Sequence, residues 1–518
     1  MSSHRKQKLE LTWIGKENRP KLEPRILLED QAKSYHAKHR VSDGDIFDNQ
    51  LIFGDNLLAL KALEAEFAGK VKCIYIDPPY NTGSAFTHYD DGVEHSIWLS
   101  LMRDRLEILW RLLEANGTLW ISIDDSEMHY LRVLLDEVCS RVNFVASNVW
   151  QKRYSRENRE AIGDAHEYVL LYAKNPEQFK RTRNKLPLGE KQLAVYKNKN
   201  NDPKGPWRAV SFSAQGFRPN QMYEIVSPYT GKKHRPPEGS CWKVIEPEYF
   251  RLLAEGRMFF GKNGDAVPSR IQYLKDIEGV VPWTWWPHEE VGHTDESKRE
   301  IQTLFGKSDA FDTPKPERLI NRILEIATNP GDLVLDSFAG SGTTAAVAHK
   351  MGRRYIGIEM GEHARSHCLP RLEKVIAGEQ GGISKPVNWQ GGGGFRFYTL
   401  GEQVFDADGG IHPSVRFPAL AAYLWHFETG QAAAKRFDRP LLGIHEGTAY
   451  YLLYNGILGD RRPQGGNVLT SAVLAHLQIE FPHAGPRVIY GEATRLSVAR
   501  LRSAGVSFRQ MPYDIRIR

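Results

Sequence analysis

The residues of this chain with the clearest chemical potential are Asp77, Pro78, Pro79 and Tyr80, which follow the apolar run from Val71 to Ile76. Such a run is typical of a short buried strand of a parallel sheet, so the motif lies where that strand ends. The prolines fix the backbone and leave the carbonyl of Pro78 with few local N–H donors. Asp77 and this carbonyl can accept two hydrogen bonds from a planar amine that stacks on Tyr80. The motif therefore predicts a pocket for an aromatic amino group.

A second motif is a glycine-bearing loop between two predicted strands, at residues 333–336 and 355–358. Gly340 and Gly342 allow a sharp turn and a close approach to a ligand, and Glu359 can bind both hydroxyls of a ribose. The same spacing occurs in dinucleotide enzymes and is weak when taken alone. The carboxylate of Asp336, which precedes the loop, suits a cationic ligand better than a pyrophosphate. S-Adenosylmethionine is therefore the favoured cofactor.

Around these motifs, predicted strands alternate with predicted helices. The alternation predicts an α/β fold with a doubly wound, mostly parallel sheet of the Rossmann-like type. The polar loop that ends at Glu94 is interpreted as a flap beside the amine pocket. The expected strands are 50–53, 71–76, 118–123, 144–150, 166–172, 333–336 and 355–358, and the expected helices are 57–67, 95–115, 126–139, 317–327 and 344–351.

The alternation stops between residues 176 and 305, where basic and aromatic residues become frequent. Basic side chains interleaved with aromatic rings suit contacts to the phosphates and bases of a nucleic acid. The alternative is that most of these rings form the core of an inserted domain. The basic residues predicted to contact DNA lie just before this segment and at its start: Lys152, Arg153, Arg156, Lys180, Arg181 and Arg183.

The motif from Asp77 to Tyr80, followed by Asn81, Thr82 and Gly83, resembles the catalytic motif of DNA amino-methyltransferases. It looks most like the adenine-N6 enzymes, notably the modification subunits of type III restriction systems. The order of parts is the catalytic motif, then the insertion, then the cofactor loop, and it is similar to the beta group of these enzymes. The resemblance spans roughly residues 51–371.

This resemblance implies a site-specific enzyme that transfers a methyl group from S-adenosylmethionine to the N6 atom of a flipped-out adenine in double-stranded DNA. It implies a catalytic role for Asp77, Pro78, Pro79 and Tyr80, and a homodimer. It also allows a restriction subunit as a partner, although the short C-terminal region leaves this open. The residues expected to bind the cofactor are Asp55, Asp77, Phe311, Thr313, Lys315, Asp336, Phe338, Ala339, Gly340, Gly342, Thr343 and Glu359.

Five segments are expected along the chain. They are an N-terminal arm, interpreted as one short helix or a disordered tail (1–45), the catalytic half of a methyltransferase domain (46–175), a target-recognition domain (176–305), the cofactor-binding half (306–385), and a small C-terminal α/β domain (386–518). The last segment includes the glycine run at 391–394, which is interpreted as a linker or a set of turns.

Four other functions are compatible with parts of the sequence. An N4-cytosine methyltransferase would use the same two acceptors, but such enzymes more often resemble Ser-Pro-Pro-Tyr where Asp77 stands here. An inactive DNA-binding relative would have no need of Asp77 and Tyr80. An RNA methyltransferase is disfavoured because so large an insertion suits a duplex, and a nicotinamide oxidoreductase would have no use for Asp77 beside the cofactor.

The composition agrees with a soluble, cytoplasmic protein. The 518 residues are 41% hydrophobic and 25% charged, and no apolar run reaches the roughly 18 residues of a membrane helix. The N-terminus lacks the apolar stretch of a secretory signal, and four scattered cysteines predict reduced thiols. No metal is expected. A net charge of +6 is too small to indicate a nucleic-acid partner without a view of where the charge lies.

Overall fold

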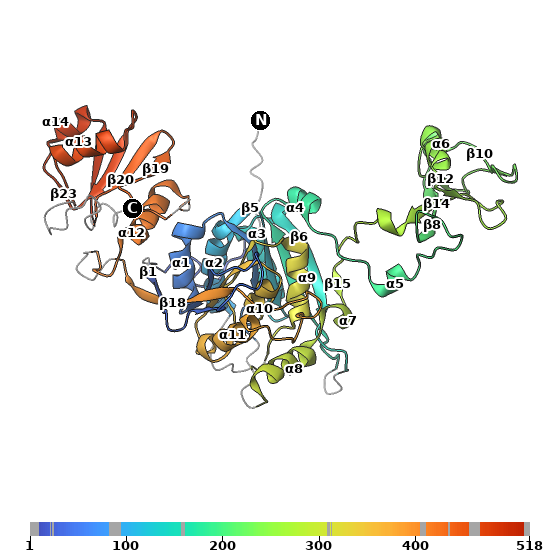
Figure 1. Ribbon diagram of the computed structural model, residues 1–518, viewed down its shortest axis with the longest axis horizontal. Helices are drawn as coiled ribbons and strands as arrows, with labels where there is room; N and C mark the ends of the chain where they lie inside the picture. Colours follow the sequence, from blue (N-terminus) through green and yellow to red (C-terminus); the bar gives the residue numbers. More distant parts are fainter. Residues whose placement is uncertain are drawn as a thin grey trace. The chain divides into compact units, whose positions relative to one another are not determined.

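The computed structural model describes residues 10–20, 22, 25–81, 95–156, 161–307, 311, 313–404, 411–431, 433, 436–454 and 467–511. Residues 82–94, where the sequence predicts a flap, lie outside this range. The chain forms two compact units. The main unit comprises Met1–Asn184 and Trp283–Arg518, and the inserted unit comprises Lys185–Pro282 (Figure 1).

The main unit is built on a mixed β-sheet whose strands lie in the order β1-β18-β3-β17-β16-β4-β5-β7-β6-β15, with β2 beside β18. The strands from β18 to β5 are parallel, whereas β1 and β7 run antiparallel to their neighbours. The strand bounds are β1 Arg25–Glu29, β2 Tyr35–His36, β3 Asn49–Phe53, β4 Val71–Ile76, β5 Leu113–Ile123, β6 Phe144–Gln151, β7 His166–Ala173, β15 Trp285–Trp286, β16 Leu333–Asp336, β17 Arg354–Glu359 and β18 Gly394–Gln403.

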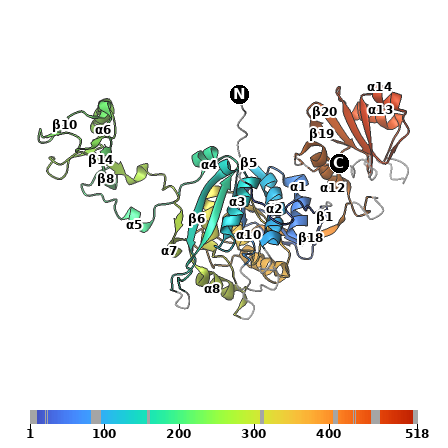
Figure 2. The ribbon, with the colours of Figure 1, turned by 180° about the vertical axis from the view of Figure 1, so that it is seen from behind.

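Two groups of helices cover the two faces of this sheet, as the views in Figures 1 and 2 show. One group is α1 (Asn56–Phe67), α2 (His95–Leu112) and α3 (Met128–Val138), and the other is α9 (Glu317–Ala327), α10 (Thr343–Lys350) and α11 (Leu369–Ile376). In α9 the apolar residues repeat every three or four positions and are buried, which is why this stretch folds as a helix against the sheet. The predicted doubly wound α/β fold is confirmed.

The helix groups separate at the middle of the sheet, between β4 and β16. The chain leaves β4 toward β5 through α2, and it leaves β16 in the opposite direction, toward β17, through α10. Right-handed crossovers in opposite directions place their helices on opposite faces. The connections after β4 and β16 therefore diverge, and ligands of open α/β sheets bind at the strand ends where this happens.

Two parts of the sheet differ from what the sequence suggested. The N-terminal arm contains strands β1 and β2 in its described residues, and β1 pairs with β18. Strand β18 belongs to the main sheet, between β1 and β3, although it was expected within the C-terminal domain. The turns before it are tight, because added Cβ atoms at Gly391, Gly392 and Gly393 would lie 2.6–2.8 Å from neighbouring oxygens. Pairing between strands hundreds of residues apart leaves no local pattern to read.

The inserted unit is narrower than the segment expected from the sequence. It contains the sheets β13-β14-β8, β12-β9 and β10-β11, and the helices α5 and α6. Helix α4 (Pro176–Thr182), α7 (His288–Val291) and α8 (Thr294–Phe305) belong to the main unit. The bounds in the insert are α5 Glu190–Leu193, β8 Trp207–Ser211, β9 Ser213–Gln215, β10 Ile225–Val226, β11 Lys233–His234, β12 Ser240–Trp242, α6 Glu246–Ala254, β13 Met258–Phe259 and β14 Ser269–Tyr273.

The C-terminal part forms a sheet of its own, β19-β20-β22-β24, with a small second pair, β21 and β23. Strand β22, helix α14 and strand β24 make a small strand-helix-strand unit within the segment expected as a C-terminal α/β domain. The bounds are α12 Phe417–Thr429, β19 Leu441–His445, β20 Thr448–Leu452, β21 Val468–Leu469, α13 Ser471–Glu480, β22 Arg487–Gly491, β23 Ala493–Thr494, α14 Val498–Ser503 and β24 Val506–Gln510. No helix among the described residues is long and apolar enough to cross a membrane.

Candidate active site

Asp77 and Tyr80 lie directly after β4, at the point where the two crossovers diverge. The Tyr80 hydroxyl donates to Oδ1 of Asp77 at 2.8 Å, and its ring is partly buried against the main core. The indole N–H of Trp98 donates to the carbonyl of Pro79 at 2.8 Å. No N–H or O–H group of the described residues donates to the carbonyl of Pro78. The carbonyl of Pro78 therefore keeps its capacity to accept within the described residues, and the two-acceptor pocket stays a prediction.

Lys315 and Glu167 complete a charged cluster with these two residues. Nζ of Lys315 lies 2.6 Å from Oδ2 of Asp77 and 3.7 Å from Oε2 of Glu167. The Tyr80 hydroxyl also lies 3.0 Å from the same oxygen of Glu167. The lysine ammonium is 5.1 Å from the centre of the Tyr80 ring. The site thus holds two carboxylates, one ammonium and one phenol, all largely buried.

Burial decides the protonation of this cluster. It raises the pKa of Asp77, with Lys315 acting in the opposite direction and Glu167 adding to the rise. Burial would lower the pKa of Lys315, but the charges of Asp77 and Glu167 outweigh it, so that this pKa is raised. Burial and the nearby Asp77 raise the pKa of Tyr80 well above its ordinary value. Lys315 therefore stays charged and Tyr80 stays a neutral donor around neutral pH.

The glycine-bearing loop follows β16, which pairs in parallel with β4. Gly340 and Gly342 have φ values of 53° and 77°, in the left-handed region that favours glycine. Glu359, at the end of β17, is fully buried, and its two carboxylate oxygens accept from the backbone N–H groups of Gly340 (2.7 Å) and Gly361 (2.8 Å). The predicted acidic residue thus lies against the predicted loop.

Asp336 supports the start of the same loop. Its carboxylate accepts from the backbone N–H of Phe338 at 2.9 Å and from the hydroxyl of Thr344 at 2.5 Å. Burial raises its pKa to about 7. Each of its two carboxylate oxygens accepts a hydrogen bond from the loop, so Asp336 stabilises the conformation of the loop.

The other residues predicted to bind the cofactor surround this loop to different degrees. Phe311 is close to it, because an added Cβ at Gly340 would lie 3.3 Å from the end of the Phe311 ring. Thr313 is exposed, whereas Phe338, Ala339 and Thr343 are buried. Asp55 caps helix α1 by accepting from the backbone of Leu57 and Leu58, and its side chain stays 40% exposed.

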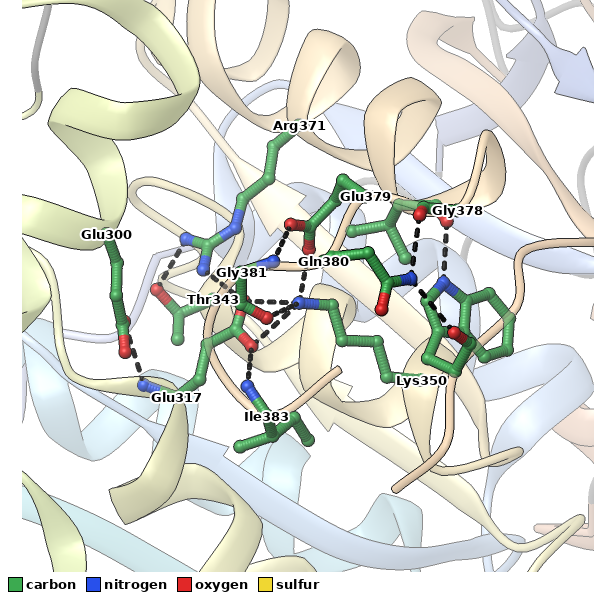
Figure 3. A network of polar contacts seen from close by, with 12 residues as sticks. Glu300, Glu317, Thr343, Lys350, Arg371, Gly378, Glu379, Gln380, Gly381 and Ile383 are labelled. Atoms are coloured by element: carbon green, nitrogen blue, oxygen red, sulfur yellow. Dashed lines mark hydrogen bonds and ion pairs between the residues drawn. The ribbon is translucent and has the colours of Figure 1, made fainter. Parts of the chain in front are cut away.

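A buried ion network fixes the loop from the protein interior (Figure 3). Arg371 donates to the hydroxyl of Thr343 and to Oε1 of Glu317, each at 2.8 Å. Lys350 donates to Oε2 of Glu317 at 2.8 Å and also pairs with Glu379. Burial would raise the pKa of Glu317, but Arg371 and Lys350 outweigh it and keep this pKa low. Burial and the neighbouring Glu317 raise the pKa of Glu300 to about 7.

Sequence reasoning missed two acidic residues at the site. Glu167 and Glu127 are both largely buried, and Glu127 accepts from Nδ2 of Asn81 at 2.7 Å. Glu167 lies in strand β7, whose residues 169–171 are apolar. A charged residue within an apolar strand is a signal for a paired or functional group, since isolated burial of a charge is costly.

The residues predicted to contact DNA fall into two groups. Arg153, Arg156, Lys180 and Arg181 are exposed, and Arg183 is partly buried. Lys152 is only 12% exposed, and its ammonium lies 2.6 Å from Asp164 and 3.5 Å from Glu167. Lys152 therefore faces the charged cluster.

The four cysteines are buried and free.

Metal binding finds no support in the part of the chain described by the structure. No group of three or more His, Cys, Asp or Glu side chains there is arranged to hold a metal ion.

Comparisons with known proteins agree with these features. A family model described as DNA methylase matches residues 71–368, more than half of the chain. The probable type III restriction-modification enzyme HindVI Mod subunit of Haemophilus influenzae is 33% identical over 423 residues, which are 70% of this chain and 55% of that protein.

Two further relatives carry similar names. The type III restriction-modification enzyme StyLTI Mod subunit of Salmonella typhimurium is 33% identical over 334 residues, covering 57% of this chain and 49% of that protein. The DNA adenine methyltransferase YhdJ of Escherichia coli is 26% identical over 325 residues, covering 62% and 82%. The chain spans about half the length of the two Mod subunits. The predicted resemblance is confirmed, and the chain belongs to the DNA methylase family.

Proposed function

We propose that this protein transfers a methyl group from S-adenosylmethionine to the N6 atom of adenine at specific sites in double-stranded DNA. The carrying observation is the position of the amine-binding motif and the glycine loop at the ends of two neighbouring parallel strands, β4 and β16. Groups on these adjacent strand ends can face one another across the divergence of the crossovers. A bound base and a bound cofactor would then meet within one site.

The residues of the loop fit S-adenosylmethionine. Glycines at 340 and 342 leave room for a ligand close to the backbone. A carboxylate can accept about four hydrogen bonds, so Glu359 can bind ribose hydroxyls in addition to the N–H groups of Gly340 and Gly361. Phe311 adds a ring beside Gly340, and Lys315 and Thr313 follow it in the chain. When bound, this cofactor supplies a methyl group that is already activated on a sulfonium. Neither a metal nor a nucleophilic side chain is needed.

The chain's own residues hold and orient the target amine. The base stacks on Tyr80, while its NH2 group donates one hydrogen bond to Asp77 and one to the carbonyl of Pro78. These two acceptors draw the nitrogen lone pair out of conjugation with the ring. As positive charge develops on the nitrogen during transfer, the carboxylate of Asp77 stabilises it, and orientation supplies much of the remaining rate enhancement. The proton leaves to Asp77 or to water.

The inserted unit supports the choice of DNA as the substrate. Its 98 residues contain 16 Lys and Arg against 10 Asp and Glu, so it carries a net charge of +6, equal to that of the whole chain. The remaining residues balance at 53 basic and 53 acidic. Such a concentration of positive charge favours a phosphate backbone.

The side chains of the inserted unit divide between a core and a surface. Trp207 and Trp242 are buried, which makes them part of the unit's own core. Phe217 and Tyr229 are more than 70% exposed, and Arg218, Lys232 and Arg235 are exposed as well. These residues are the ones we propose for contacts to phosphates and bases.

Adenine is chosen over cytosine because Asp stands at position 77, and the name of the relative YhdJ agrees with this choice. The names of the HindVI and StyLTI Mod subunits support a place in a type III restriction-modification system, with a restriction subunit as a partner. The homodimer and the cytoplasmic location stay predictions from the family resemblance and the composition.

Expression of the full chain in a host without DNA methylation tests this function. Mass spectrometry of digested host DNA is expected to give N6-methyladenine, and single-molecule sequencing then maps the site. An Asp77→Asn variant serves as the negative control. N4-methylcytosine in the digest would contradict the base assignment, and the absence of any methylated base would contradict the function itself.

A further inference from the structure

Two hydrogen-bond donors of the active site lie between the same two carboxylates. The Tyr80 hydroxyl is 2.8 Å from Asp77 and 3.0 Å from Glu167, and the Lys315 ammonium is 2.6 Å from Asp77 and 3.7 Å from Glu167. A hydroxyl has one hydrogen and serves one acceptor well at a time. Both donors therefore already have a second acceptor within reach, and this acceptor is the same oxygen, Oε2 of Glu167.

This arrangement competes with binding of the target base. Both oxygens of Asp77 are engaged, one by Tyr80 and the other by Lys315, although Asp77 has to accept the target amine under the proposed function. Lys315 also lies 5.1 Å from the centre of the Tyr80 ring on which the base would stack. A base that enters the site has to displace at least one of these donors.

Glu167 is held in a position to receive them. Its other oxygen, Oε1, lies 3.5 Å from the ammonium of Lys152, which is itself paired with Asp164. The charged and titratable groups that face Glu167 are thus Asp77 and Tyr80 after β4, Lys315 before α9, and Lys152 after β6. Asp124, after β5, is also near: burial raises the pKa of Asp124, and the charge of Glu167 adds to the rise. Oε2 is the oxygen directed toward the two donors of the active site.

We propose that Glu167 is a positioning residue that accepts the Tyr80 hydroxyl and the Lys315 ammonium when Asp77 releases them to bind the target amine. This inference rests on the proposed function and adds a residue to it. Without Glu167, Lys315 has only Asp77 as a nearby counter-charge in the cluster, and the base has to compete with a full ion pair in a largely buried site. The main cost then falls on capture of the amine and on the rate of transfer.

Glu167→Gln tests the proposal, with Asp125→Asn as a matched control on the same edge of the sheet. Asp125 is 62% exposed and accepts from Tyr168. On DNA with the mapped site, Glu167→Gln is expected to slow single-turnover methyl transfer about tenfold or more, while Asp125→Asn stays close to the wild type. Glu167→Asp, which keeps the charge, is expected to recover much of the rate. Melting temperature and S-adenosylmethionine calorimetry establish that each variant is folded.

A double-mutant cycle separates positioning from a purely structural role. In a Lys315→Met background no ammonium has to be moved, so Glu167→Gln is expected to slow transfer much less than in the wild type. A second readout needs no cofactor. Wild-type protein is expected to bind a duplex with adenine at the target position more tightly than one with purine, which lacks the amine, and Glu167→Gln is expected to reduce this preference.

The outcomes distinguish this inference from the function on which it rests. If the wild type transferred no methyl group to DNA, the proposed function would fail. If the wild type were active and Glu167→Gln matched it in rate and in preference for adenine, only the role of Glu167 would fail. Equal losses from Glu167→Gln in the wild-type and Lys315→Met backgrounds would also overturn it.

Discussion

The ammonium of Lys315 lies 2.6 Å from Oδ2 of Asp77, although 238 residues separate them in the chain. Asp77 follows β4 and Lys315 precedes α9, so the contact closes the charged cluster between the two halves of the main unit. The ammonium of Lys315 balances the negative charge of the largely buried Asp77 carboxylate. Both oxygens of Asp77 are thus engaged, so under the proposed function the target amine has to replace one of these partners.

Asp77→Asn is expected to lower methyl transfer by about 100-fold or more, because an amide cannot stabilise the positive charge that develops on the target nitrogen. Calorimetry measures S-adenosylmethionine binding separately, and so divides the loss between cofactor binding and methyl transfer. The exposed Asp125→Asn again provides a control. If Asp77→Asn transferred the methyl group at the wild-type rate, Asp77 would have no role in the reaction.

Glu359→Ala is expected to weaken S-adenosylmethionine binding by about 1–3 kcal/mol, because charge-assisted hydrogen bonds to the ribose are removed along with the bond that holds Gly340. Isothermal calorimetry measures the change. Glu362→Ala removes a nearby carboxylate that is 65% exposed and is expected to bind like the wild type. Tight binding of NAD, with no response to S-adenosylmethionine, would contradict the cofactor assignment.

Replacing Lys232, Lys233 and Arg235 by Gln is expected to flatten the salt dependence of DNA binding. For every phosphate that the variant no longer neutralises, the slope of log K against log salt falls by about 0.9. Fluorescence anisotropy at several salt concentrations measures this slope. Arg439→Gln, at an exposed position of the main unit, is the control. An unchanged slope in the triple variant would exclude these residues from the DNA interface, and cofactor binding should be unaffected throughout.

Glu300→Gln is expected to change how stability depends on pH. The pKa of Glu300 is raised from its ordinary 4.5 to about 7 in the folded protein, so the folded state binds this proton more tightly than the unfolded state. The resulting stability is present below pH 4.5 and is lost as the pH rises to about 7. Between pH 4.5 and about 7, the melting temperature of the wild type should therefore fall relative to that of Glu300→Gln. Parallel curves would contradict the raised pKa, and Glu362→Gln serves as the exposed control.

Lys350→Met is expected to destabilise the fold by about 3–5 kcal/mol, because it leaves the buried carboxylates of Glu317 and Glu379 without one of their cations. Denaturant unfolding measures the loss. Lys385→Met, at an exposed position, is expected to cost less than about 0.5 kcal/mol. A variant as stable as the wild type would show that the network contributes little.

The sequence by itself determined the features that depend on neighbouring residues. The apolar run before Asp77 predicted β4, and the glycines at 340 and 342 predicted the loop after β16. The helix expected over residues 317–327 is α9, with the same bounds. These features follow from local steric and hydrophobic rules, which act within a few residues. They were sufficient for the fold class, whereas the family came from the resemblance of the motif at residues 77–83 and of the order of parts.

Only the tertiary structure decided which distant residues meet. Three features could not be read from local patterns: the pairing of β1 with β18, the narrower bounds of the inserted unit, and the position of Glu167 between Lys152 and Lys315. Lys152 looked like a phosphate contact because basic residues surround it in the chain, but it is paired with Asp164. The physical reason is that a buried charge is stable only beside a compensating group, and folding brings that group from another strand.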